Sequence, residues 1–115
     1  LTTVHGNSPR DALERLTTLA MMAEERLSYE ALSRMVARTI DLVVQLRFDA
    51  LTRRRRVQSI FEVSGMEGDV TTGNELWLID PVTDKLTWTG IRPRSLARMA
   101  AKGVDYAPPP SEVRT

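Results

Sequence analysis

The hydrophobic period of the chain changes at Asp41, and this change is the strongest constraint on its fold. Before Asp41, apolar residues recur at spacings of three and four, as in amphipathic helices. After it, residues 42–48 are short, apolar and rich in β-branched side chains, which predicts a sheet strand with much of both faces covered. The sequence therefore predicts an α/β fold in which helices precede a sheet.

Two helices are predicted before Asp41. The first begins after Ser8, a capping residue followed directly by proline, and ends near Glu24. The second runs from about residue 29 to residue 39. Three methionines belong to these helices and are interpreted as core: Met21, Met22 and Met35.

Two hairpins and a short helix are predicted after Asp41. The segments expected to form their strands are residues 42–48, 56–63, 75–80 and 85–89. Between the hairpins, residues 65–69 are expected to form a turn or loop. Pro93 opens the short helix, Gly103 closes it, and residues 108–115 are a flexible, proline-rich tail.

Composition excludes several classes of protein. A chain of 115 residues is long enough for one ordinary domain, and a net charge of +1 gives no general attraction to nucleic acid. With no cysteine and one histidine, the sequence supports neither a disulfide framework nor a structural zinc site. The longest stretch without formal charge is nine residues, too short to span a bilayer. Because residues 1–4 read as the middle of a strand, we expect a fragment of a longer protein.

Few residues suggest chemistry. Gly68 and Gly73 have the glycine spacing of a phosphate-binding loop, but Glu75 follows where that loop needs lysine and a hydroxyl, so this interpretation is rejected. His5 lies between an expected strand end and a helix start, where it is either a hydrogen-bonding or exposed turn residue or a phosphate or catalytic contact. Ser8 beside it is better explained as a helix cap than as a nucleophile.

The most conspicuous charge run consists of four consecutive arginines: Arg53, Arg54, Arg55 and Arg56. This run is a solvated hairpin tip, a nucleic-acid contact of the kind made by the wing of a winged helix, or a contact to an acidic subunit. Glu62, Glu67 and Asp69 could hold a cation, but they lack the order and spacing of a calcium loop, so an unpaired acidic loop is preferred and no metal site is predicted.

The segment Thr-Val-His-Gly-Asn-Ser-Pro-Arg-Asp-Ala-Leu-Glu-Arg-Leu, residues 3–16, closely resembles the histidine box and following helix of the type II/IV secretion-system ATPases. The likeness is greatest to the CpaF-type branch, which powers tight-adherence pili. It continues through residues 40–45, 54–57 and 60–69, and more faintly through 87–90 and Pro93, so that it covers roughly residues 1–107.

This resemblance implies the C-terminal part of a RecA-like P-loop ATPase domain. Such a protein would be a cytoplasmic homo-hexamer at the inner membrane. It would hydrolyse ATP with Mg²⁺ to drive pilus assembly or protein secretion, and its partners would be platform proteins of the inner membrane. His5 matches the second histidine of the family's box, which implies that it senses or orients the terminal phosphate, and Thr3 would end the strand beneath it. The four arginines would face another subunit or the anionic membrane surface.

The chain departs from the family in one decisive respect. The Walker A loop, the aspartate box, the Walker B acid and the first histidine lie upstream in such proteins, and none is present in these 115 residues. The chain alone is therefore predicted to be inactive and to bind neither ATP nor Mg²⁺. Without central strands, the apolar side of residues 42–46 and both first helices would be exposed, so a marginally stable or self-associating chain is expected.

Two other functions stay open. One is a winged-helix-like nucleic-acid-binding module that uses the second helix and the arginine run, although the nearly neutral chain argues against nucleic acid. The other is a non-catalytic subunit that docks on complete ATPases.

Overall fold

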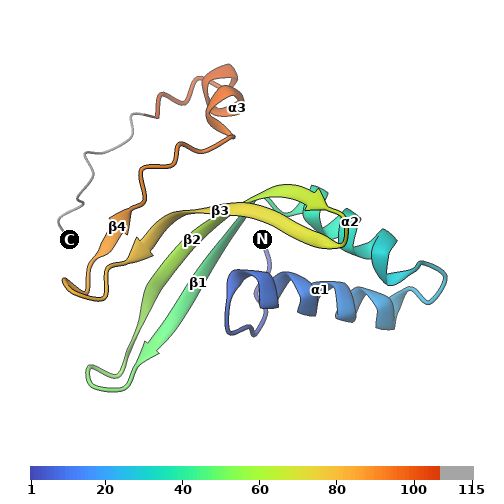
Figure 1. Cartoon of the computed structure of the whole chain (residues 1–115), viewed down its shortest axis with the longest axis horizontal. Helices are drawn as coiled ribbons and strands as arrows, with labels where there is room; N and C mark the ends of the chain where they lie inside the picture. The colour runs from blue at the N-terminus through green and yellow to red at the C-terminus, as the bar shows by residue number, and fades with distance from the viewer. Residues whose placement is uncertain (107–115) are drawn as a thin grey trace. The chain divides into compact units, whose positions relative to one another are not determined.

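The computed structural model describes residues 1–106 and shows a mixed α/β protein with three helices and a four-stranded sheet (Figure 1). The elements in chain order are α1 (Pro9–Ala23), α2 (Tyr29–Thr39), β1 (Leu42–Asp49), β2 (Arg54–Glu67), β3 (Val70–Ile79), β4 (Leu86–Trp88) and α3 (Leu96–Ala101). The antiparallel sheet has the order β1-β2-β3-β4. This confirms the predicted α/β class, although the sheet is antiparallel, whereas a RecA-like sheet is usually parallel. The predicted tail, residues 108–115, lies outside the described residues.

The described residues belong to two compact units. The first comprises Leu1–Val43 and Val63–Gly73, and the second comprises Val44–Glu62 and residues 74–106. No helix among residues 1–106 has the length and apolar character that crossing a membrane requires.

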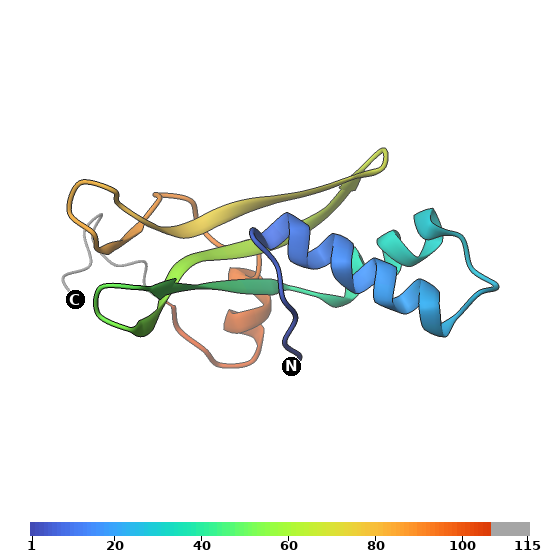
Figure 2. The ribbon, with the colours of Figure 1, turned by 90° about the horizontal axis from the view of Figure 1, so that it is seen from below.

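In the first unit, α1 and α2 pack against each other and lie side by side in both views (Figures 1 and 2). Their small buried core consists of Ala12, Leu13, Leu32 and Ala37. Both predicted caps are present, because the hydroxyl of Ser8 accepts from the amide of Asp11 and that of Ser28 accepts from the amide of Ala31, each at 3.1 Å.

Two predictions for this unit are wrong. Met22 and Met35 are 77% and 53% exposed, and Met21 is exposed as well, because they lie on helix faces that no other described element covers. Residues 1–4 form no strand in the structure, since no described strand lies beside them to supply the backbone hydrogen bonds that a strand requires.

The strand β1 lies at one edge of the sheet and carries an alternating row of apolar side chains. Leu42, Val44, Leu46 and Phe48 are 48%, 53%, 49% and 60% exposed. The prediction of a strand with both faces largely covered is therefore wrong for the described residues. The expectation that this apolar side would be exposed is confirmed.

The hairpin between β2 and β3 was not predicted. Residues 65–67, expected in a turn or loop, extend β2, and the chain reverses at Gly68, whose φ of 64° suits glycine in a tight turn. Gly73 lies within β3, which agrees with the rejection of a phosphate-binding loop.

The smaller predicted hairpin is present in the second unit. Trp77 of β3 lies opposite Trp88 of β4, and Ile79 lies opposite Leu86. The predicted terminal helix is α3, after which Gly103 adopts a φ of 77°, as expected of a residue that ends a helix.

Candidate functional site

The segment that precedes α1 carries His5 and is bound tightly to the first turn of that helix. The amide of Asn7 donates to Oδ2 of Asp11 at 2.8 Å. A Cβ atom at Gly6 would lie 2.9 Å from both the backbone nitrogen and the Cα of Ala12, so only glycine fits there without a shift of the backbone. The backbone on the C-terminal side of His5 is thus positioned by packing and hydrogen bonding.

The side chain of His5 itself is exposed. The start of α1 is already capped by Ser8, and the carboxylate of Asp11 adds a negative charge beside it, so this helix end is a poor site for an anion. What the segment offers chemically is an accessible imidazole, which can donate or accept a hydrogen bond. The structure thus places His5 on the surface of the first unit.

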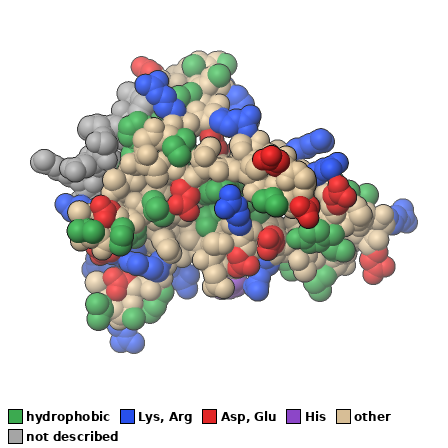
Figure 3. Space-filling view, in the orientation of Figure 1, with side chains coloured by type: hydrophobic (Ala, Val, Ile, Leu, Met, Phe, Trp, Pro, Cys, Tyr) green, Lys and Arg blue, Asp and Glu red, His purple; other side chains and the backbone are tan. Residues whose placement is uncertain are grey.

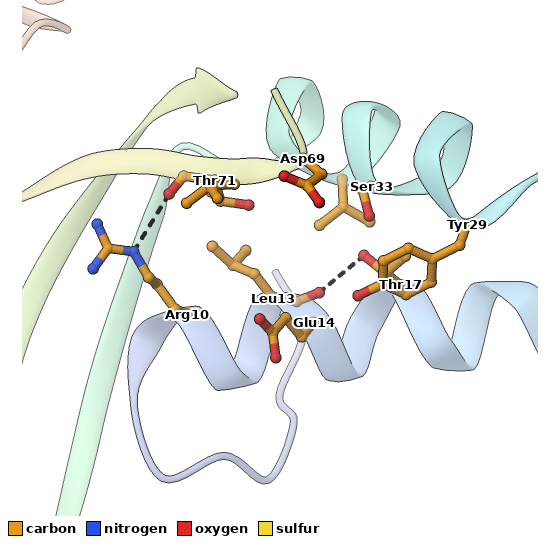
Figure 4. Close-up of a pocket in the computed structure, with 10 residues that line it drawn as sticks. Arg10, Leu13, Glu14, Thr17, Tyr29, Ser33, Asp69 and Thr71 are labelled. Carbon is orange, nitrogen blue, oxygen red and sulfur yellow. Dashed lines mark hydrogen bonds between the residues drawn. The ribbon is translucent and has the colours of Figure 1, made fainter. Parts of the chain in front are cut away.

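A small pocket of about 90 Å³ lies in the same unit (Figure 4). Its lining comes from α1, α2, the β2–β3 turn and the start of β3, and consists of Arg10, Leu13, Glu14, Thr17, Tyr29, Ser33, Val36, Asp69, Val70 and Thr71. In Figure 4, Arg10 Nε donates to the carbonyl of Thr71 at 3.3 Å. Typical ligand pockets are several times larger, so this pocket suits a few water molecules rather than a nucleotide. Sequence reasoning did not find it, and His5 does not line it.

The predicted arginine run belongs to the second unit and divides into two parts. Arg53, Arg54 and Arg55 are exposed, with Arg53 in the β1–β2 turn at a φ of 56°. Arg56 is half-buried and bridges to the β3–β4 turn: its Nη1 lies 2.5 Å from Oδ2 of Asp84, and its Nη2 donates to the carbonyl of Asp84 at 2.7 Å. Arg56 therefore holds two turns together.

Two further contacts complete this network. Arg47 Nη2 lies 3.5 Å from Oδ1 of Asp84, and Arg56 Nη1 lies 3.8 Å from Oδ2 of Asp49. Asp49 also accepts from the amides of Leu51 at 2.9 Å and Thr52 at 3.3 Å. These backbone hydrogen bonds to Thr52 and Leu51, with a smaller contribution from Arg56, lower the pKa of Asp49 below its ordinary value.

Glu62 has a different environment from the one predicted. It lies in β2, is 5% exposed, and accepts hydrogen bonds from the amide of Arg94 at 2.6 Å and from the hydroxyl of Ser95 at 3.0 Å. The interpretation of Glu62 as part of an unpaired acidic loop is wrong, because its carboxylate anchors the backbone just before α3. The sequence contained no sign of this contact, because Glu62 and Arg94 are 32 positions apart. Among residues 1–106, no three acidic, histidine or cysteine side chains are arranged to hold a metal ion.

Comparison of the chain with models of known protein families gave no match, and comparison with curated proteins gave no relative.

Proposed function

We propose that residues 1–107 are the C-terminal part of the RecA-like motor domain of a secretion or pilus-assembly ATPase, and that His5 contacts the terminal phosphate of ATP in the complete domain. The observation that carries the proposal is the fixed backbone beside His5. A side chain that senses phosphate must be accessible and must extend from a backbone of fixed position, because small displacements weaken its contact with the phosphate. The fit of Gly6 against Ala12 and the bond from Asn7 to Asp11 supply such a backbone.

The edge of the sheet also supports the proposal. Antiparallel strands commonly extend the edge of an otherwise parallel sheet, so an antiparallel β1–β4 segment is compatible with a larger RecA-like sheet. The half-exposed apolar row of β1 is what a strand that packs under further elements would present.

The chain itself does not fit ATP and Mg²⁺. Its sequence holds no Walker A loop, and the described residues offer no group of metal ligands. Nucleotide and metal would be held by upstream residues of the longer protein, and the only part of that chemistry proposed for this chain is the contact from His5. We propose further that the complete protein is a cytoplasmic homo-hexamer that acts on platform proteins of the inner membrane.

Two experiments test it in sequence. The reading frame upstream of the Leu1 codon should encode Gly-x-x-x-x-Gly-Lys-Ser/Thr; a start codon directly before Leu1 would overturn the proposal. In the longer protein, His5→Ala should lower ATP turnover by roughly 10- to 100-fold, as expected for loss of one positioned contact to developing charge. The control is Arg15→Ala, an exposed change on α1 that should leave turnover intact. Equal turnover in wild type and His5→Ala would remove His5 from the site.

Nucleic-acid binding is the second candidate, favoured by the exposure of Arg53, Arg54 and Arg55 at one turn. Two contacts weaken it, because Arg56 is bound to Asp84, and Arg34 on the second helix, α2, is paired with Glu30 at 2.8 Å. Salt-dependent binding of duplex DNA that is lost on changing the exposed arginines would support this function. No binding at low salt would exclude it.

A further inference from the structure

Two turns at one end of the second unit carry exposed apolar side chains. The β1–β2 turn and the β3–β4 turn lie at the same end of the sheet in both ribbon views (Figures 1 and 2). Leu51 in the first turn is 96% exposed and Val82 in the second is 90% exposed. Phe48, at the end of β1 just before the first turn, is 60% exposed. Leu51 and Val82 are thus almost wholly exposed to solvent at two neighbouring turns.

Hydrogen bonds order both turns. The carboxylate of Asp49 accepts from the amide of Leu51 at 2.9 Å, and that of Asp80 accepts from the amide of Val82 at 2.8 Å. The bridge from Arg56 to Asp84 joins one turn to the other. The apolar side chains are therefore displayed from fixed backbone positions, which lowers the entropic cost of binding through them.

The charges at this end are distributed unevenly. Arg53, Arg54 and Arg55 make no ion pair with any residue in the described part of the chain. The three nearby carboxylates are all engaged, because Asp49 and Asp80 accept from backbone amides and Asp84 pairs with Arg56. Basic and hydrophobic side chains lie beside acidic ones at the lower left of the space-filling view (Figure 3). The surface available to a partner is cationic and apolar together.

We propose that this turn surface, defined as Phe48, Leu51, Arg53, Arg54, Arg55 and Val82, binds an anionic lipid membrane. Leu51 and Val82 would enter the boundary between headgroups and acyl chains, while the arginines bind lipid phosphates. A nucleic acid would match the arginines but would gain nothing from the two apolar tips. A membrane with anionic headgroups satisfies both features at once.

This inference does not rest on the ATPase proposal, because the 115-residue chain carries the whole surface. The chain is mixed with vesicles of phosphatidylcholine alone, or of phosphatidylcholine with about a third phosphatidylglycerol, and bound protein is measured by flotation. Binding should be strong to the anionic vesicles, weak to the neutral ones, and reduced by added salt.

Substitutions separate the two parts of the surface. Arg54→Gln and Arg55→Gln should each weaken binding about fivefold, and Leu51→Ser should weaken it roughly tenfold although it changes no charge. The matched controls are Arg15→Gln and Met22→Ser, an exposed arginine and an exposed apolar residue of the first unit, which should bind like wild type. All these side chains are exposed, so the variants should keep the thermal unfolding of the wild type, which is recorded alongside.

Three results would overturn the proposal. Equal binding to neutral and anionic vesicles would show that the arginines do not contribute to membrane binding. Binding of Leu51→Ser as strong as that of wild type would show that the apolar side chain at the turn does not contribute either. Preferential binding of duplex DNA, insensitive to Leu51→Ser, would assign the surface to nucleic acid instead. None of these results would bear on the contact proposed for His5.

Discussion

At the scale of single residues, Gly6 shows why the segment that carries His5 has a fixed shape. The sequence predicted the cap at Ser8 from local residue types alone. It gave no signal that Gly6 would lie against the backbone of Ala12, because that contact depends on how the chain approaches the helix. Likewise, the residue type of Glu62 did not disclose its partners Arg94 and Ser95, which lie 32 and 33 positions away.

The contact between Gly6 and Ala12 predicts the effect of a methyl group. Gly6→Ala should destabilise the chain by about 1–3 kcal/mol, because its Cβ would meet backbone atoms that cannot move aside as a flexible side chain could. The free energy of unfolding is measured by urea denaturation. His5→Ala, an exposed change at the neighbouring position, should stay within about 0.5 kcal/mol of wild type. A Gly6→Ala variant as stable as wild type would show that the segment is not held as described.

At the scale of secondary-structure elements, the helices were predictable and one hairpin was not. The bounds of α2 were predicted closely because its cap and its apolar period agree. The β2–β3 hairpin was missed because Gly65 and Gly68 suggested a loop, whereas only Gly68 lies at the reversal. Contacts from other segments support this hairpin, such as the bond from Arg10 to the carbonyl of Thr71, and a local pattern does not contain them.

The β1–β2 turn should make stability depend on pH through Asp49. Its ordinary pKa is 3.8, and the amides of Thr52 and Leu51 lower that pKa in the folded chain. The contribution of Asp49 to the free energy of unfolding is therefore complete above the ordinary pKa, and it is lost as the pH falls through the lower pKa of the folded chain. Between about pH 5 and about pH 2, wild type should lose more stability than Asp49→Asn, as measured by thermal unfolding at each pH.

The control for this titration is Glu25→Gln, which removes an exposed carboxylate between the helices. It should follow the wild-type pH profile. If Asp49→Asn and wild type lost the same stability on acidification, the carboxylate of Asp49 would not be the group that links this turn to pH.

At the scale of the whole molecule, the described residues bury few large apolar side chains for their number. The buried apolar residues are Ala12, Leu13, Leu32, Ala37, Phe61 and Leu76. In contrast, the edge strand β1 leaves its row of apolar side chains half exposed, although the sequence pattern is that of a covered strand. A sequence pattern indicates which side chains are suited to burial. It does not indicate whether the residues that bury them belong to the same 115 residues.

An apolar edge strand predicts that the 115-residue chain associates with itself, because an unpaired strand edge and its exposed face can pair with a second copy. Sedimentation velocity should show larger species as the protein concentration rises. Leu46→Lys should weaken this association roughly tenfold or more, because it places a charge in the middle of the apolar row. Thr18→Lys, an exposed substitution on α1 that adds the same charge, should associate like wild type.

A chain that stayed monomeric at every concentration would mean that the exposed apolar row of β1 does not drive pairing between copies. The exposure of that row would then have to be explained by a partner other than a second copy of the chain.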